Sequence, residues 1–108
     1  MLNLDGLKDI VGDDQTLMQD MLEQFIETTQ ADMTHLHDAV AAGRSRDVAN
    51  LAHRIKGSCF VIGATQLADI AAALEDDGRK DHQEQFSTLA RQMTDVFQKV
   101  VDSIRSPG

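Results

Sequence analysis

Apolar residues recur at spacings of three and four along most of the chain, which is the period of one face of an α-helix. The pattern predicts a short helix near residues 4–11 and a long helix that ends near residue 42. A third helix should run from about residue 45 to residue 62, a fourth should begin near residue 64 or 65, and another should occupy the C-terminal part. The expected inward residues of the longest helix are Met18, Leu22, Phe25, Ile26, Met33, Leu36 and Val40.

Glycines and short polar residues mark the expected helix ends. Gly12, Gly43 and Gly63 each follow a periodic apolar stretch, and glycine readily adopts the left-handed backbone that ends a helix. Asp13 or Asp14 can cap the long helix, because a side-chain oxygen at that position accepts a bond from a free backbone N–H.

Three further polar motifs are expected to bound the remaining helices. Ser45 is a suitable N-cap for the third helix. Asp76-Asp77-Gly78 has the composition of a turn that closes the fourth helix, and Asp81 and Glu84 are spaced as a capping box for the last one. Four substantial amphipathic helices joined by short turns predict an all-α fold, an antiparallel up-down four-helix bundle with a short extra N-terminal helix.

Composition agrees with a single helical domain over residues 1–108. The chain is 42% hydrophobic and has one proline and no Trp or Tyr, so Leu, Ile, Val, Met and Ala should build the core. The formal net charge of −8 disfavours nucleic acid or an anionic membrane as a partner, because phosphate binding needs an excess of Lys and Arg. No apolar run approaches membrane-spanning length, and the single Cys59 cannot form an internal disulfide. These features favour a cytoplasmic location.

The candidate site lies on the third helix, around His53. The core stripe of that helix is formed by Val48, Leu51, Ala52, Ile55, Cys59 and Ile62. His53 falls roughly 150° from the centre of this stripe, so its side chain should face outward. Its expected neighbours on the outward face are Ala49, Lys56, Gly57 and Phe60. A glycine in mid-helix costs about 1 kcal/mol relative to alanine, so this face must favour a bare backbone beside an exposed imidazole.

Other kinds of site find little support. His35 and His37 are two residues apart on a helix and point in widely different directions, so they cannot chelate a metal together. Cys59 should point into the core and Ser58 away from the His53 face, which argues against a thiol or hydroxyl nucleophile. No glycine-rich phosphate loop is present that would indicate nucleotide binding.

The chemistry that fits His53 is phosphoryl transfer. An imidazole is substantially neutral at pH 7, and its free ring nitrogen is then a competent nucleophile. Lys56 lies one turn later and can neutralise a phosphoryl group, while Gly57 removes the side chain that would block another protein from the imidazole. A magnesium site, a leaving group and a phosphate cradle would have to come from that partner.

At these residues a family resemblance emerges. The motif His53-Arg-Ile-Lys56-Gly57-Ser58, followed by Gly63-Ala64 and Leu74-Glu75, resembles the signature of the histidine phosphotransfer (HPt) domains of phosphorelays. The resemblance covers essentially the whole chain. It implies that His53 accepts a phosphoryl group from the phospho-aspartate of one receiver domain and passes it to the aspartate of another. Response-regulator receivers are therefore the expected partners, with a hybrid sensor histidine kinase as a further candidate.

The resemblance also assigns roles to the neighbours of His53. Lys56 and Gly57 carry over directly. Glu75 matches a position whose side chain can orient the imidazole through its other nitrogen, the alternative being an exposed glutamate at a helix end. Phe60 fits either an apolar part of the docking face or packing against a neighbouring helix. The receiver would supply magnesium, so we expect this chain to have no cofactor of its own. We also expect a monomer without autonomous kinase activity.

Two alternatives remain at the level of sequence. A non-catalytic helical adaptor could bind a partner through the Ala49–Phe60 face, although docking alone does not require His53 together with Lys56 and Gly57. A metal-binding helical protein is the third possibility, and it would show metal-dependent thermal stabilisation.

Overall fold

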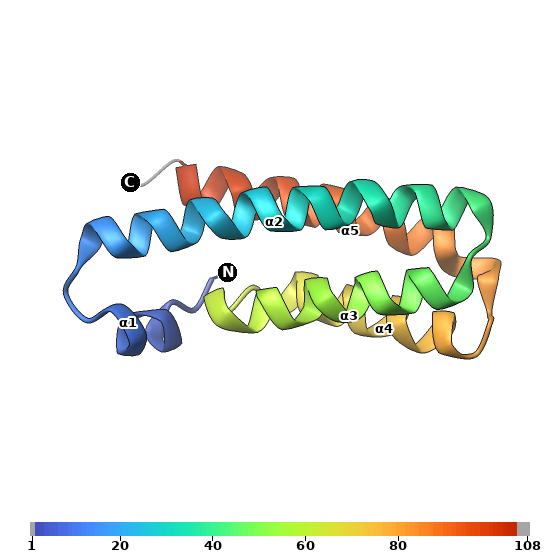
Figure 1. The fold of residues 1–108 in the computed structure, drawn as a ribbon, viewed down its shortest axis with the longest axis horizontal. Coiled ribbons are helices and arrows are strands. Elements are labelled where there is room, and N and C mark those ends of the chain that lie inside the picture. The colour runs from blue at the N-terminus through green and yellow to red at the C-terminus, as the bar shows by residue number, and fades with distance from the viewer. Residues whose placement is uncertain (1, 106–108) are drawn as a thin grey trace.

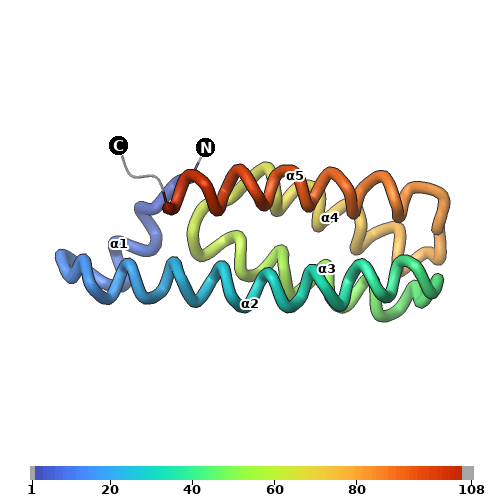
Figure 2. Tube along the Cα trace, turned by 90° about the horizontal axis from the view of Figure 1, so that it is seen from above, coloured from blue at the N-terminus to red at the C-terminus, as the bar shows by residue number. Residues whose placement is uncertain are grey.

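The computed structural model describes residues 2–105, and it contains no β-strand within that range. Four long helices lie side by side, and consecutive ones run in opposite directions (Figure 1). Each packs against two neighbours, in the cyclic order in which they follow one another along the chain (Figure 2). The elements are α1 (Asp5–Val11), α2 (Gln15–Ala42), α3 (Ser45–Ile62), α4 (Thr65–Arg79), the short 3₁₀ turn η1 (Gln83–Gln85) and α5 (Phe86–Arg105). The predicted all-helical fold class is confirmed.

The short helix α1 covers the part of α2 that α3 does not reach. It contacts both α2 and α3, and it lies beyond the C-terminal end of α3 (Figure 1). Leu7 and Val11 are buried in this contact, whereas Ile10 of the same helix is 66% exposed. A helix of two turns presents only a narrow stripe to its neighbours, and Ile10 falls outside that stripe.

Local chemistry explains the ends of α2 and α3. Asp14 caps α2 by accepting a bond from the backbone N–H of Leu17 at 2.9 Å. Gly43 and Gly63 follow the last residues of α2 and α3, and both adopt the left-handed conformation with φ of 67°. A Cβ at Gly63 would also lie 2.1 Å from the carbonyl oxygen of Asn3. Only glycine therefore lets the N-terminal segment pass at this point.

The core agrees with the predicted stripes. Cys59 is completely buried, and Phe25 and Phe97 pack with their ring centroids 6.3 Å apart. Three polar or charged residues are also buried: Thr29, Asp32 and Glu75. Of these, Glu75 lies closest to the candidate site.

The predicted turn at Asp76-Asp77-Gly78 is wrong, because α4 continues to Arg79. Gly78 is buried where α4 crosses α3, and a Cβ there would lie 2.9 Å from both the carbonyl oxygen of Ser45 and the backbone nitrogen of Ala49. This glycine therefore serves close helix packing and does not end the helix. For the same reason Ala49 is only 3% exposed, so its predicted place on the outward face is also wrong.

The expected caps of α3 and α5 are replaced by one network between two loops. Ser45 is the first residue of α3 and not its N-cap, and its hydroxyl donates to the Asp81 carboxylate. Asp81 also accepts from Nε2 of Gln83 at 2.9 Å, so it is engaged here and does not form a capping box with Glu84. The network joins the α2–α3 connection to the α4–α5 connection through Gln83, the first residue of η1.

Candidate functional site

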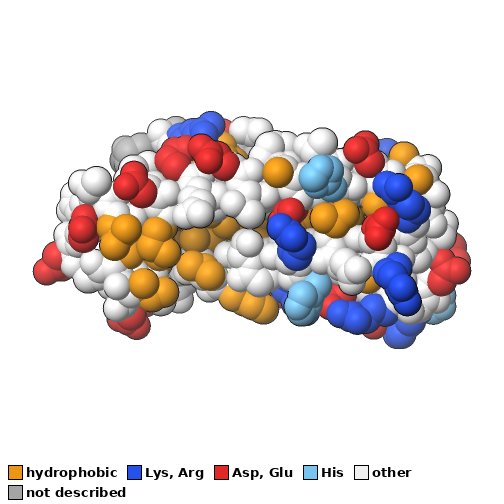
Figure 3. Space-filling view, viewed as in Figure 1, with side chains coloured by type: hydrophobic (Ala, Val, Ile, Leu, Met, Phe, Trp, Pro, Cys, Tyr) orange, Lys and Arg blue, Asp and Glu red, His pale blue; other side chains and the backbone are white. Residues whose placement is uncertain are grey.

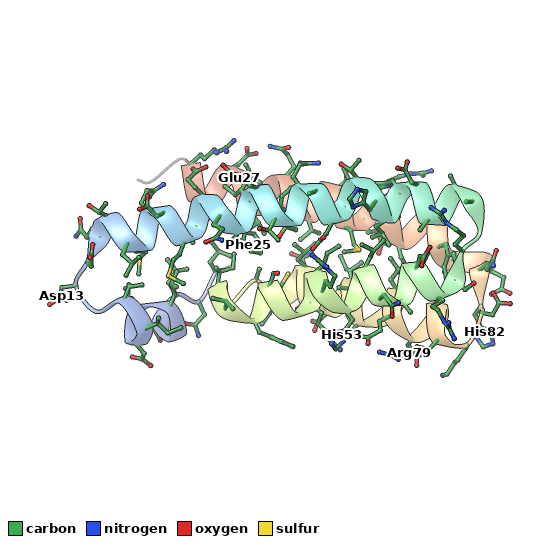
Figure 4. The ribbon with its side chains drawn as sticks, viewed as in Figure 1. Asp13, Phe25, Glu27, His53, Arg79 and His82 are labelled. Carbon is green, nitrogen blue, oxygen red and sulfur yellow. The ribbon has the colours of Figure 1, made fainter. Side chains whose placement is uncertain are left out.

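His53 projects from the middle of α3 with 62% of its side chain exposed. The opposite face of α3 is held in the core by Val48, Ala49, Ala52, Ile55, Cys59 and Ile62. Because these residues fix the rotation of the helix about its axis, the outward position of His53 follows from the apolar pattern. Figure 4 shows the labelled side chain at the outer edge of α3.

One ring nitrogen of His53 is bound by a buried carboxylate. Glu75, on α4, is only 6% exposed, and its Oε2 lies 2.9 Å from Nδ1 of His53. An ionised carboxylate can only accept hydrogen bonds, so Nδ1 carries the proton and donates it to Glu75. In the neutral imidazole the other nitrogen, Nε2, then holds the free lone pair.

Two cations bind the same carboxylate. Nζ of Lys56 lies 2.6 Å from Oε1 of Glu75. Nη2 of Arg79 lies 2.5 Å from Oε2, and its Nε lies 3.2 Å from that oxygen. Lys56 comes from α3, one turn after His53, and Arg79 comes from α4, one turn after Glu75. The buried glutamate thus accepts hydrogen bonds from three side chains on two helices.

These neighbours keep Glu75 ionised. Burial by itself would raise the pKa of the carboxyl, because it disfavours the charged form. Hydrogen bonds from Lys56, Arg79 and His53 outweigh that effect and lower the pKa of Glu75 from 4.5 to about 2. The carboxylate is therefore charged at any physiological pH, and it holds the proton of His53 on Nδ1.

The surface around His53 is open. Gly57 is exposed, and a Cβ at this position would meet no atom within 4 Å. Phe60 is 66% exposed, as the outward interpretation predicted, and it does not pack against a neighbouring helix. A partner can therefore approach the imidazole over the bare backbone of Gly57 and the apolar ring of Phe60, which both follow His53 on α3.

The structure brings together most of the residues singled out from the sequence. His53, Lys56 and Glu75 share one cluster, with Gly57 and Phe60 beside it on α3. Ala49 is excluded because it is buried against Gly78. Lys56 was expected on the outward face beside His53. Its ammonium group instead pairs with Glu75, and its side chain is only 26% exposed.

Arg79 is the site residue that the sequence interpretation missed. The predicted turn at residues 76–78 placed Arg79 outside the helix, where its spacing from Glu75 had no meaning. On a continuous helix the two residues are four apart and face one another, which is the signal that could have found the pair.

Neither a metal nor a thiol competes with this site. No group of three or more His, Cys, Asp or Glu side chains in the described part of the chain is placed to hold a metal ion. Burial raises the pKa of the Cys59 thiol to about 12, so this cysteine stays protonated and unreactive.

The surface of the molecule differs in chemical character on the two sides of His53. The large exposed hydrophobic side chains are Ile10, Leu17, Phe60 and Val61. They belong to α1, the start of α2 and the end of α3, which meet at one end of the molecule. Figure 3 shows hydrophobic side chains gathered over that half and Lys and Arg side chains over the other. The middle of α3, where His53 lies, is the boundary between the two halves.

Comparison with known families assigns the chain. The Hpt domain family matches residues 20–102, which is most of the sequence. The chain belongs to the Hpt domain family. The match covers α3 and α4 completely and therefore includes the whole cluster around His53.

Relatives of this Hpt domain include sensor proteins and a solved structure. It is 25% identical over 104 residues to the sensor protein EvgS of Escherichia coli strain K12, and equally so to EvgS of strain O157:H7. Each alignment covers 92% of this chain and 9% of EvgS, so the chain spans about a tenth of these curated relatives. The crystal structure of histidine-containing phosphotransfer protein B (HptB) from Pseudomonas aeruginosa PAO1 has the same fold. Its TM-score is 0.90 and its identity 24%, over 96% of this chain and 90% of HptB.

Family membership bears on the functions that the sequence left open. An Hpt domain is a phosphorelay intermediate, so the family match supports this function over a non-catalytic adaptor. None of the helices within residues 2–105 is long and apolar enough to cross a membrane.

Proposed function

We propose that His53 is the residue that carries the phosphoryl group. The observation that supports this assignment is the bond between its Nδ1 and the buried, ionised Glu75, with the ring projecting into solvent. Such a bond fixes the tautomer in which Nε2 holds the free lone pair, as an orienting carboxylate does for other catalytic histidines.

The transfer step does not require a proton to leave the imidazole ring. The Nε2 lone pair attacks the phosphorus of a receiver phospho-aspartate, the Nε2–P bond forms, and the bond from phosphorus to the aspartate oxygen breaks. The aspartate keeps the electron pair and becomes a carboxylate. The ring gains a positive charge while its Nδ1 proton stays on Nδ1, against Oε2 of Glu75. The reverse attack by a second receiver's aspartate returns His53 to its neutral form.

The partner supplies what this chain lacks. A receiver would contribute its acidic pocket and its magnesium ion, and this domain would contribute the nucleophile, local positive charge and a docking face. Gly57 leaves room for the receiver to reach Nε2, and the exposed ring of Phe60 offers an apolar contact beside it. Lys56 would stabilise the phosphoryl group as the negative charge approaches the site.

We also propose a finer description of the molecule and its setting. The opposite directions of consecutive long helices support an antiparallel up-down four-helix bundle in which α1 is an extra N-terminal helix. A monomer in the cytoplasm suits a carrier that must meet several receivers. The similarity to EvgS makes a hybrid sensor histidine kinase a proposed source of the phosphoryl group.

A two-step transfer experiment tests this function. A receiver domain is phosphorylated, separated from its phosphodonor and mixed with this chain, and a second, unphosphorylated receiver is then added. We expect label to appear first on this chain and then on the second receiver. Failure of every receiver in a broad panel to label the folded chain would contradict the proposal.

A further inference from the structure

Arg79 occupies an unusual place in the cluster around His53. Its guanidinium donates two hydrogen bonds to Oε2 of Glu75, the same oxygen that accepts from Nδ1 of His53. Lys56 binds the other oxygen, Oε1. In Figure 4 the labelled side chains of His53 and Arg79 reach the same edge of the molecule.

We propose that Arg79 is a positioning residue for phosphoryl transfer, and that it acts through Glu75 by holding Oε2 as a charged acceptor against Nδ1 of His53. This inference rests on the proposed role of His53 as the phosphorylated residue. The hydrogen bonds of the Arg79 guanidinium go to Glu75 and not to the imidazole, so its contribution passes through the carboxylate.

Geometry gives Arg79 a role that Lys56 cannot fill. A lysine is a point charge, and Lys56 binds Oε1 from α3, the oxygen that does not face the ring. Arg79 directs two donors of one rigid planar group, Nε and Nη2, at Oε2, the oxygen that accepts from Nδ1 of His53. Because Arg79 and Glu75 are one turn apart on α4, this alignment is independent of small shifts between helices.

The charges of the cluster also require a second cation. Glu75, Lys56 and Arg79 together carry one net positive charge when His53 is neutral. Phosphorylation adds about two negative charges on the phosphoryl group and one positive charge on the ring. The phosphorylated site is then close to neutral with Arg79 present and would be negative without it. Arg79 thereby stabilises the state in which the domain carries its cargo.

The first test measures the tautomer of His53 without any phosphodonor. Nitrogen NMR of the unphosphorylated protein distinguishes a proton on Nδ1 from one on Nε2. We expect the wild-type protein to hold the proton on Nδ1 and Arg79→Ala to give a mixture of both tautomers. An unchanged Nδ1 tautomer in Arg79→Ala would overturn the proposal. This result is independent of whether any receiver transfers phosphoryl groups to the chain.

Lys80→Ala is the matched control. Lys80 directly follows α4 and also pairs with a carboxylate four residues earlier, at 3.1 Å, with a similar side-chain exposure of 57% against 60% for Arg79. Its partner Asp76 is exposed, and this pair shares no hydrogen bond with His53, Lys56 or Glu75. We expect Arg79→Ala to slow transfer from a phosphorylated receiver roughly tenfold, as loss of an orienting partner commonly does, and Lys80→Ala to leave the rate unchanged.

A double-mutant cycle separates the indirect role from direct contact with the phosphoryl group. In a Glu75→Gln background the carboxylate charge is absent, so Arg79→Ala should cost little beyond the loss already caused by Glu75→Gln. An equal tenfold loss in both backgrounds would show that Arg79 acts directly on the phosphoryl group, and would overturn the route through Glu75. A wild-type chain that no receiver labels, combined with the expected tautomer change, would contradict the phosphorelay role of His53 and leave the Arg79–Glu75–His53 linkage standing.

Discussion

His53 differs from the other histidines of the chain in what binds its ring. His35 and His82 are exposed, and His37 contacts the hydroxyl of Thr94 at 2.8 Å. Only His53, among the described residues, has a buried carboxylate on one ring nitrogen while most of its side chain remains in solvent. That combination orients the ring and leaves its second nitrogen accessible, which is what a transferable phosphoryl group requires.

The low pKa of Glu75 predicts an acid-dependent loss of stability. Its folded pKa of about 2 lies below the unfolded value of 4.5, so its ionised form stabilises the fold fully above pH 4.5. This contribution should be lost as the pH falls from 4.5 toward 2. Urea unfolding across that range measures it, with Glu75→Gln as the comparison. The difference in unfolding free energy between wild type and Glu75→Gln should shrink with falling pH, and a constant difference would contradict the proposed ion cluster.

The sequence alone was sufficient to predict the positions of some site residues and not of others. The outward position of His53 and the burial of Cys59 follow from helical period alone, and both are confirmed. Whether Glu75 was an orienting residue or an exposed helix end could not be decided, because the answer depends on how α4 faces α3. The cluster with Lys56 is a contact between helices, which periodicity within one helix does not contain.

At the scale of elements, two glycines in helix interiors lie in opposite environments. Gly57 on α3 faces solvent, and nothing lies within 4 Å of where its Cβ would be. Gly78 on α4 is buried against α3, where a Cβ would lie 2.9 Å from backbone atoms. Neither position has the left-handed backbone that would by itself require glycine. The second therefore serves close packing between helices, whereas the first has no packing reason, and we propose that it provides access for a partner.

Alanine substitutions at these two glycines should change stability in opposite directions. Gly57→Ala should stabilise the protein by about 0.5–1 kcal/mol, because alanine restricts the unfolded chain and fits the open surface. Gly78→Ala should destabilise it by about 1–3 kcal/mol, because its methyl group forces α3 and α4 apart. Chemical denaturation of both variants checks the contrast. Equal effects would mean that Gly57 is as tightly packed as Gly78.

A larger side chain at Gly57 tests the role of access. Gly57→Leu should leave the protein folded, since the position is open, while the leucine should obstruct a receiver that approaches His53. We expect transfer from a phosphorylated receiver to slow by roughly a hundredfold, because displacement of reacting groups by about 1 Å already has that effect. Transfer at the wild-type rate in the folded variant would mean that Gly57 does not provide clearance.

Helix boundaries were predictable where one residue determines them. Asp14, Gly43 and Gly63 end or begin helices through their own backbone or side chain, and the sequence predicted the two glycines and gave Asp14 as one of two candidates. Asp81 and Gly78 were misassigned because their partners are distant in sequence. Asp81 is recruited by Ser45 at the other loop, and Gly78 is required by the approach of α3. At both positions, contacts between elements determine the structure and override the local sequence propensity.

At the scale of the whole molecule, His53 lies at a boundary between two kinds of surface. Exposed apolar side chains gather toward α1, while Lys and Arg side chains are more frequent over the opposite half of the same face (Figure 3). A receiver centred on His53 would meet both surfaces at once. The apolar half offers contact area beside the exposed imidazole.

A substitution of Phe60 tests whether the apolar half of this surface binds the receiver. Phe60→Ser removes an aromatic ring that is 66% exposed and makes no core contact, so the fold should keep its stability. We expect the KM for the phosphorylated receiver to rise roughly tenfold, as for an aromatic anchor in an interface, with little change in the maximal transfer rate. Steady-state transfer kinetics check this. An unaltered KM would place the docking surface elsewhere.

The central claim is that His53 itself receives the phosphoryl group, and intact-mass measurement with His53→Gln tests it most directly. The wild-type chain, incubated with a phosphorylated receiver or a small phosphodonor, should gain the mass of one phosphoryl group in a form that is labile in acid and stable in base. His53→Gln should remain folded and gain none. Modification of His53→Gln to the same extent as wild type would contradict the account.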